Sequence, residues 1–376
     1  MALVQSPSPE FPSDGSGAAQ LQNVHQLHPP QHEGLFLPEH YQDNIRPLPP
    51  ALPQYETVAD VSRTEHIETI RHPGLGTIWR DQWYMSDGVG YKVSIGRAER
   101  SKTDIAIVNE TPLITQTKGY NEDVGLSQLQ LGYDFVLVGP EEGAEIPLSH
   151  SAHNTHAILD VLLKQGYFNE EWIALYGFSR GAEISFGNAA YADQHGRKIL
   201  YAHLVDPYGA APLEFSREQI EEFTDVAFTE ATTAIQAVGT LLMNPLRAWH
   251  YRHSIDISLE GAKQFVRTAK SVLSGEAGEL AYHFPDEAQG TVLFFGKKDG
   301  RRRRLFEEAL AGKPGLEFAG IPRGHLVNMY KKVLGQTSVR FAGLAQQLGA
   351  GVKPEDIDFG LVHKPDLGDQ ASELHL

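Results

Sequence analysis

The apolar and polar positions along the chain follow two alternating patterns. Short apolar runs predict buried strands, because they are too short for helices and are bounded by glycine, proline and polar residues. These runs occupy residues 104–109, 133–139, 172–176, 199–205, 291–295 and 316–319. Helical periodicity lies at 122–131, from Ser149 or Ser151 to 166, and from about Ala182 onward. This alternation predicts an α/β fold with a doubly wound, mostly parallel sheet and helices on both of its faces.

Three further runs precede this alternating region, at residues 65–72, 76–83 and 91–97. The pairs Pro73-Gly74 and Asp87-Gly88 lie between them and are turn signals. Strands joined by short turns pair antiparallel. The sheet is therefore expected to begin with antiparallel strands, and the core is expected to comprise residues 56–211 and 287–350.

The two ends of the chain differ from the core. Residues 1–55 carry ten of the 22 prolines and few apolar runs. Such a segment buries too little surface to offset its ordering entropy, so it is interpreted as a disordered extension or as an extended arm. Residues 351–376 are polar and lack periodicity, which predicts a peripheral C-terminal tail.

A long segment interrupts the second half of the core. Residues 212–286 are too many for an ordinary connection between a strand and its successor. Ser216 and Gln219 form a capping box, and helical periodicity follows at 229–242 and 259–273. This segment is predicted to be a helical cap, or lid, inserted over the C-terminal edge of the sheet.

Charge and composition exclude several classes of function. The 376 residues carry a net charge of −16, which disfavours nucleic acid as a partner. The absence of cysteine excludes disulfides, thiolate metal sites and cysteine nucleophiles. No apolar run approaches the ~18 residues of a membrane span. The first residues lack a basic stretch followed by an apolar core, so no signal peptide is seen and a cytoplasmic location is expected.

The strongest chemical motif follows the run at 172–176. Gly177-Phe178-Ser179-Arg180-Gly181 is a G-x-S-x-G sequence between a predicted strand and a predicted helix, the context of a nucleophile elbow. The turn holds the serine in a strained conformation, and Gly177 and Gly181 omit the β-carbons that would collide. Ser179 would then lie at a helix N-terminus, where the Arg180 amide can face a developing oxyanion.

A serine nucleophile needs a base, and the base needs a group that orients it. In this topology an acid and then a histidine should follow the serine along the chain. Asp299 lies at the turn after the run at 291–295, and His325 follows the run at 316–319. Asp206, directly after the run at 199–205, is an alternative acid.

These motifs together resemble the α/β-hydrolases of the serine-esterase and lipase type. The resemblance covers about residues 90–345 and rests on the elbow, on a strand from Gly132-Tyr133 to Gly139-Pro140, on Lys298-Asp299-Gly300 and on Gly324-His325. It implies that Ser179 is the nucleophile, that His325 is the general base and acid, and that Asp299 is the orienting carboxylate.

The second donor of the oxyanion hole departs from the family pattern. The resemblance implies that the donor lies in the loop after residues 104–109, yet no His-Gly or Gly-Gly pair stands there. Pro112 has no amide to donate. The amide of Thr111 is therefore the expected donor, with Glu110 and Leu113 as alternatives.

Two clusters of basic residues have simpler interpretations. Arg301–Arg304 could bind an anion, but Arg303 and Arg304 can pair with Glu307 and Glu308 one turn later and leave a solvated face. His150, His153 and His156 recur every third residue, but no carboxylate at ligand spacing completes a zinc site. They are interpreted as a solvated helix start, so neither a metal nor another cofactor is expected.

The sequence therefore predicts a serine hydrolase that cleaves a carboxylic ester, or a related acyl bond, through an acyl-enzyme. Its partner would be a small-molecule ester or acyl substrate under the cap. Peptidases and acyltransferases use the same triad and remain alternatives, as does a non-catalytic binding protein on the same fold. The identity of the substrate and the oligomeric state are left open.

Overall fold

The computed structural model describes eleven parts of the chain, all within the unit that spans Pro49–Leu376. The described residues are 52, 62–63, 68–86, 88–100, 105–111, 118–140, 146–167, 172–212, 274–295, 301–321 and 331–363. Apart from Leu52, the predicted N-terminal arm lies outside these residues. So does most of the predicted cap, including its helical stretches at 229–242 and 259–273.

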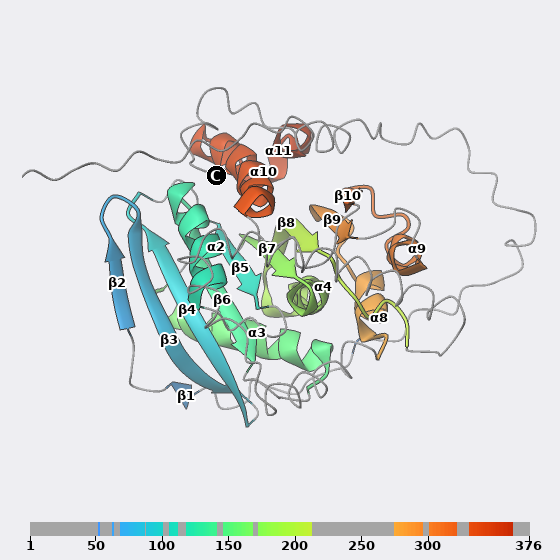
Figure 1. Cartoon of the computed structure of the whole chain (residues 1–376), viewed down its shortest axis with the longest axis horizontal. Coiled ribbons are helices and arrows are strands. Elements are labelled where there is room, and N and C mark those ends of the chain that lie inside the picture. Colours follow the sequence, from blue (N-terminus) through green and yellow to red (C-terminus); the bar gives the residue numbers. More distant parts are fainter. Residues whose placement is uncertain are drawn as a thin grey trace, which may run out of the picture. The chain divides into compact units, whose positions relative to one another are not determined.

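A single mixed sheet organises the described residues (Figure 1). Its strands are β1 (Ser62–Arg63), β2 (Glu68–His72), β3 (Gly76–Ser86), β4 (Val89–Ala98), β5 (Ala106–Glu110), β6 (Asp134–Pro140), β7 (Trp172–Phe178), β8 (Lys198–Val205), β9 (Gln289–Phe295) and β10 (Leu316–Ile321). The spatial order is β1-β3-β4-β6-β5-β7-β8-β9-β10, and β2 pairs with β3. The pairs among β1 to β4 are antiparallel, and so is the pair of β4 with β6. The remaining pairs are parallel, in the order β6, β5, β7, β8, β9 and β10. The predicted fold class is confirmed.

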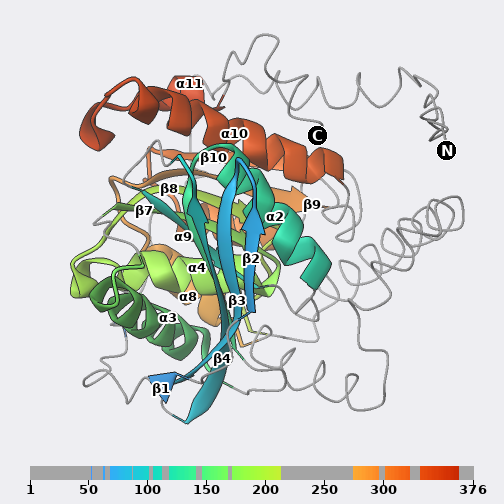
Figure 2. The same ribbon diagram turned by 90° about the vertical axis from the view of Figure 1, so that its left-hand side faces the viewer.

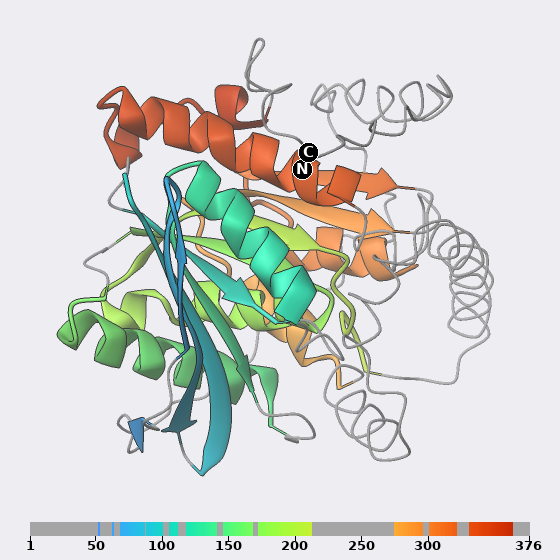
Figure 3. The same cartoon turned by 60° about the vertical axis from the view of Figure 1, so that its left-hand side comes forward.

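Helices cover both faces of this sheet, as Figures 2 and 3 show. They are α2 (Lys118–Gln130), α3 (Leu148–Lys164), α4 (Arg180–Tyr191), α8 (Glu276–Tyr282), α9 (Arg301–Ala309), α10 (Lys331–Gly349) and α11 (Phe359–His363), with the 3-10 turns η3 (Asp193–His195) and η5 (Pro354–Asp356). Helices α2, α10 and α11 lie on one face, and α3, α4, α8 and α9 lie on the other. No described helix has the combination of length and hydrophobicity that a membrane crossing requires.

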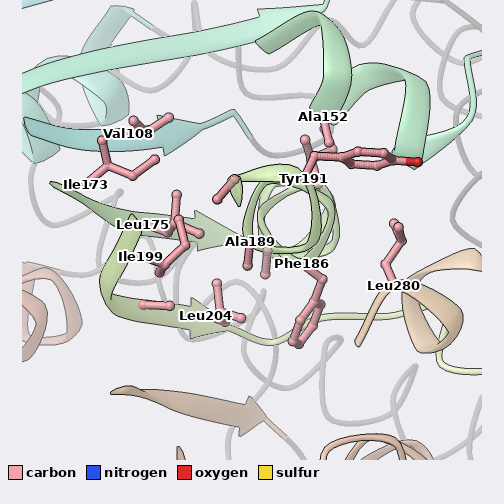
Figure 4. Packing of buried hydrophobic residues seen from close by; sticks show 14 of the residues in the cluster. Val108, Ala152, Ile173, Leu175, Phe186, Ala189, Tyr191, Ile199, Leu204 and Leu280 are labelled. Atoms are coloured by element: carbon pink, nitrogen blue, oxygen red, sulfur yellow. The ribbon is translucent and has the colours of Figure 1, made fainter. Parts of the chain in front are cut away.

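Helix α4 is the centre of the apolar core on its face of the sheet (Figure 4). Every residue of α4 is buried except Ala190, because strands lie on one side of the helix and other helices on the other. Phe186 stacks on Phe306 of α9 with ring centroids 5.2 Å apart, and Leu280 of α8 belongs to the same cluster. The apolar environment therefore fixes the helix that follows Ser179.

The segment between β8 and β9 leaves and rejoins the core at neighbouring points. Pro212 and Ser274 form an antiparallel bridge, and the Gly278 amide donates to the Gly209 carbonyl at 3.2 Å. The Glu276 carboxylate accepts hydrogen bonds from the amides of Leu148 and Ser149, at 2.7 and 2.9 Å. Helix α8, which the sequence places at the end of the cap, thus packs with the core.

The described part of the predicted C-terminal tail, residues 351–363, packs on the sheet and is not peripheral, whereas residues 364–376 lie outside the described residues. Helix α11 begins with Phe359, whose ring stacks on the buried Tyr201 with centroids 6.3 Å apart. Val362 is fully buried. These contacts could not be predicted from the sequence, because the tail is polar and α11 is a single short turn with too few residues to show a helical period.

An acid-sensitive ion cluster ties this region to β10. The Glu317 carboxylate lies 3.1 Å from His363 Nδ1 and 3.3 Å from Arg340 Nη1. The hydrogen bond with His363, reinforced by Arg340, lowers the pKa of Glu317 from its ordinary 4.5 to about 2. The folded state therefore favours the carboxylate.

We expect Glu317→Gln to weaken the dependence of stability on acid pH. Because the folded pKa is depressed, the ionised carboxylate stabilises the fold above pH 4.5, and this contribution is lost as the pH falls towards 2. Urea unfolding measured from pH 7 downward should show a smaller loss for Glu317→Gln than for the wild type between those values. Glu355→Gln on η5 is the control, and an equal flattening there would contradict the role of Glu317.

Candidate active site

Ser179 lies between the end of β7 and the start of α4. Its backbone conformation is one that few residues other than glycine adopt. Its φ is 57° and its ψ is −127°. Its amide donates to the Val205 carbonyl of β8 at 2.8 Å, and its carbonyl accepts from the amide of Ala182 at 2.9 Å. The sharp turn is therefore held by the sheet on one side and by the first turn of the helix on the other.

The two glycines of the motif permit this turn by close backbone contact. A β-carbon on Gly177 would lie 2.4 Å from the Gly181 carbonyl oxygen. One on Gly181 would lie 2.3 Å from the Glu110 carbonyl oxygen. Neither separation is sterically possible, so strand and helix approach this closely only with glycine at both positions. The geometry agrees with the elbow predicted from the sequence.

The amide of Arg180 stands at the first position of α4. An amide at the start of a helix has no acceptor within the helix and lies at the positive end of the helix dipole. Both properties suit a donor to the oxyanion that forms when a neighbouring hydroxyl adds to a carbonyl group.

The predicted second donor is already engaged. The amide of Thr111 donates to the Val138 carbonyl of β6 at 3.0 Å, which extends the β5–β6 ladder by one residue. One N–H group cannot give a full hydrogen bond to this carbonyl and to an oxyanion, so the bond argues against Thr111. The side chain of Thr111 is buried against Gly139, where a β-carbon would lie 2.2 Å from the Thr111 hydroxyl oxygen.

Asp206 is the residue that follows β8, directly beside the elbow. It is fully buried and has a φ of 53°. Among the described residues, Ser179 and Asp206 are the non-glycine positions with positive φ. Val205 pairs with Phe178 in the sheet, so the two residues occupy neighbouring positions where β7 and β8 end. Backbone strain of this kind gathers at functional sites.

The Asp206 carboxylate forms an ion pair with the second arginine of the basic run. Arg302 Nη2 lies 2.8 Å from Asp206 Oδ1, and the Arg302 guanidinium lies 4.0 Å from the centroid of the Tyr208 ring. The prediction of a solvated arginine face is therefore wrong for Arg302. It is confirmed for the pairing of Arg303, whose Nε lies 2.6 Å from Glu307.

Asp299 and His325 lie outside the described residues. The strands before them are described: β9 ends at Phe295 and β10 ends at Ile321. Both run parallel to β7 and β8, so their C-terminal ends lie at the same edge of the sheet as Ser179. This arrangement of strands is compatible with the triad predicted from the sequence. The triad itself remains a prediction.

A buried cluster of ionisable side chains, which sequence reasoning missed, lies beside the elbow. Glu110 ends β5, and Arg180 and Glu183 begin α4; all three side chains are buried. Burial raises the pKa of Glu110 to about 8, although hydrogen bonds from Asn188 and Thr155 and the charge of Arg180 oppose the shift. Burial likewise raises the pKa of Glu183 to about 8 and lowers that of Arg180.

Two of the three histidines at the start of α3 do not lie on a solvated face. His153 and His156 are buried, and the His156 ring stacks on His195 at 4.8 Å. Arg197 Nη1 lies 3.3 Å from His156 Nδ1 and its Nη2 donates to Asp160 at 2.6 Å. Within the described parts of the chain, no group of three or more ligand side chains could hold a metal ion.

Comparisons with known proteins find likeness in structure alone. No protein-family model and no curated protein sequence matches the chain. An enol-lactonase from Burkholderia xenovorans aligns over 71% of this chain and 98% of its own, with 11% identity and a TM-score of 0.48. A carboxyl esterase from Bacillus coagulans aligns over 76% and 98%, with 11% identity and a TM-score of 0.45. Brefeldin A esterase, a bacterial homologue of human hormone sensitive lipase, aligns over 78% of both chains, with 16% identity and a TM-score of 0.43.

At these identities and TM-scores, the likenesses assign no activity to this chain. The fold stands on the molecule itself: a mostly parallel sheet with antiparallel first strands, helices on both faces, and a strand-turn-helix elbow that carries a strained serine. The chain has the α/β-hydrolase fold.

Proposed function

We propose that the protein is a serine hydrolase that cleaves a carboxylic ester or a related acyl bond. The observation that carries the proposal is the conformation of Ser179, with a φ of 57° at a turn that both neighbouring glycines make possible. A strained serine at the C-terminal edge of a parallel sheet and at a helix N-terminus has the surroundings of a nucleophile. The proposed triad is Ser179, His325 and Asp299.

In the first half of the reaction, Ser179 Oγ adds to the acyl carbon while His325 removes the hydroxyl proton. The Arg180 amide donates to the resulting oxyanion. The second donor belongs to the residues after Thr111, and Leu113 is the proposed candidate, because Pro112 has no amide. Collapse of the tetrahedral intermediate breaks the ester bond, and His325 returns the proton to the departing alcohol.

In the second half, His325 removes a proton from water, and the hydroxide oxygen adds to the acyl-enzyme. Collapse of the new intermediate breaks the bond to Ser179 Oγ and releases the carboxylic acid, and His325 returns the proton to Oγ, which restores the Ser179 hydroxyl. The small-molecule substrate is proposed to bind under the helical cap at residues 212–286. A panel of esters, amides and acyl acceptors distinguishes esterase activity from the peptidase and acyltransferase alternatives that share this triad.

The acid of the triad can be identified by two matched variants. Asp299→Asn is expected to lower kcat by roughly three to four orders of magnitude, because an amide cannot hold the histidine in the required tautomer. Asp206→Asn should instead act mainly on stability, because it leaves the largely buried Arg302 side chain without its carboxylate, at a cost of about 3–5 kcal/mol.

The measurements are ester hydrolysis and urea unfolding on each variant. If Asp206→Asn stayed folded and lost as much activity as predicted for Asp299→Asn, while Asp299→Asn stayed active, the assignment of the acid would be wrong. Asp206 would then replace Asp299 in the triad.

A further inference from the structure

We propose that Glu110 is a positioning residue, whose side chain and backbone together hold the start of α4, and with it Ser179, at the end of β5. The inference rests on the proposed function, because it concerns the reactivity of Ser179. It adds a residue that neither the nucleophile motif nor the triad contains.

Glu110 contacts both glycines of the elbow through its backbone. It pairs with Gly177 in the register between β5 and β7. Its carbonyl oxygen occupies the place that a β-carbon on Gly181 would need, 2.3 Å away. The last residue of β5 is thus packed directly against the turn that shapes Ser179, so a shift of Glu110 must move the turn.

The side chain of Glu110 connects the same point to two helices. Its Oε1 accepts hydrogen bonds from the Thr155 hydroxyl of α3 and from the Asn188 side-chain amide of α4, both at 2.8 Å. All three side chains are buried. Asn188 lies in the same helix as Arg180, so the carboxyl group ties the far part of α4 to the strand that its first turn touches.

Other buried ionisable groups lie near this carboxyl group. Arg180 on α4 favours the ionised forms of both Glu110 and Glu183. Tyr91 on β4 also interacts with both Glu110 and Arg180. Among the described residues, Arg180 Nε and Nη2 and the second oxygen of Glu110 have no hydrogen-bond partner, so the bonds to Thr155 and Asn188 are the contacts that hold the carboxyl group.

Burial of the Glu110 carboxyl group between β5, α3 and α4 has an energetic cost. Removal from water disfavours the charged form, and an apolar side chain of similar volume would often be as stable. An apolar side chain would not accept directed hydrogen bonds from two helices, and such bonds fix orientation. The cluster therefore suits a role in geometry better than a role in stability.

The test compares three variants by their second-order rate of labelling with a fluorophosphonate and by kcat and KM on an ester. Glu110→Ala removes the acceptor and is expected to slow labelling and lower kcat by about 10- to 100-fold, because small displacements of a reacting group have effects of this size. KM should change less than about twofold, because the Glu110 side chain is buried and offers no surface to a substrate. Glu110→Gln keeps the acceptor oxygen and should recover most of the rate.

Asp160→Asn is the matched control. Asp160 also joins α3 to a neighbouring segment, through Arg197 at 2.6 Å, but its other partner is His195 of η3 and it does not lie at the elbow. It should lose stability without slowing the labelling. If Glu110→Ala does not fold, Thr155→Val removes one of the two donors and should slow labelling by about threefold.

Provided that the wild type is labelled, either of two results would overturn the inference. One is that Glu110→Ala is labelled at the wild-type rate, and the other is that Asp160→Asn slows labelling as much as Glu110→Ala does. If the folded wild type were not labelled at all, the proposed function itself would be contradicted. The positioning role of Glu110 would then be contradicted as well, because it depends on a reactive Ser179.

Discussion

Replacement of Ser179 by alanine is expected to lower ester hydrolysis by at least about three orders of magnitude, because loss of the nucleophile removes the covalent step. Stability should change by less than about 0.5 kcal/mol, since alanine keeps the β-carbon and removes a hydroxyl from a half-buried site. Steady-state hydrolysis and urea unfolding measure the two effects separately.

The glycine variant at the same position tests the strain. Ser179 holds a φ of 57° and a ψ of −127°, which glycine adopts without penalty. Ser179→Gly should therefore be as inactive as Ser179→Ala but more stable than the wild type, by about 1–3 kcal/mol. If Ser179→Gly unfolded at the same urea concentration as Ser179→Ala, the strained turn would not describe the protein in solution.

Alanine at Gly181 should cost both stability and activity. Its β-carbon would lie 2.3 Å from the Glu110 carbonyl oxygen and 2.9 Å from the carbonyl carbon, so the strand and the helix must separate. Overpacking of backbone against backbone is expected to cost about 1–3 kcal/mol or more. Because the separation displaces Ser179 and the Arg180 amide, labelling by a fluorophosphonate should fall by about 100-fold even where the variant folds.

Gly312→Ala is the control for Gly181→Ala. Gly312 has a φ of 86°, and no atom lies within 4 Å of the place that a β-carbon would take, so alanine there suffers backbone strain but no collision. We expect a loss of about 1–2 kcal/mol in the free energy of unfolding with wild-type labelling. Equal labelling of Gly181→Ala and the wild type would contradict the close contact between the elbow and β5.

The elbow and the parallel strands could be predicted from the sequence because their signals are local. Gly177, Ser179 and Gly181 lie within five positions, and each apolar run of the central strands is bounded by residues that end a strand. The order of the strands in space could not be read in this way. The crossover that places β6 between β4 and β5 depends on contacts between distant segments.

The oxyanion loop shows the opposite case. The expectation for Thr111 came from counting residues after a strand, and it placed the end of β5 at Asn109. The strand continues to Glu110, and the Thr111 amide still pairs with Val138 of β6. A ladder that extends by one or two residues changes which amide is available, and the boundaries of an element are the part that sequence reasoning predicts least well.

The buried polar residues could not be predicted because their partners are far away along the chain. Glu110 meets Thr155 and Asn188, which are 45 and 78 positions away. His156 is buried because η3 stacks upon it, although its spacing suggests an exposed helix start. A single polar residue carries no period, so its burial depends on the tertiary structure alone.

The central claim is that Ser179 is an activated nucleophile. Its most direct test is peptide mapping by mass spectrometry after reaction with a fluorophosphonate, on the wild type and on Ser179→Ala. We predict one adduct on the wild type, on the peptide that carries Ser179, and none on Ser179→Ala. A folded wild type without an adduct, or an adduct that persists in Ser179→Ala, would contradict the claim and favour a binding protein built on a hydrolase fold.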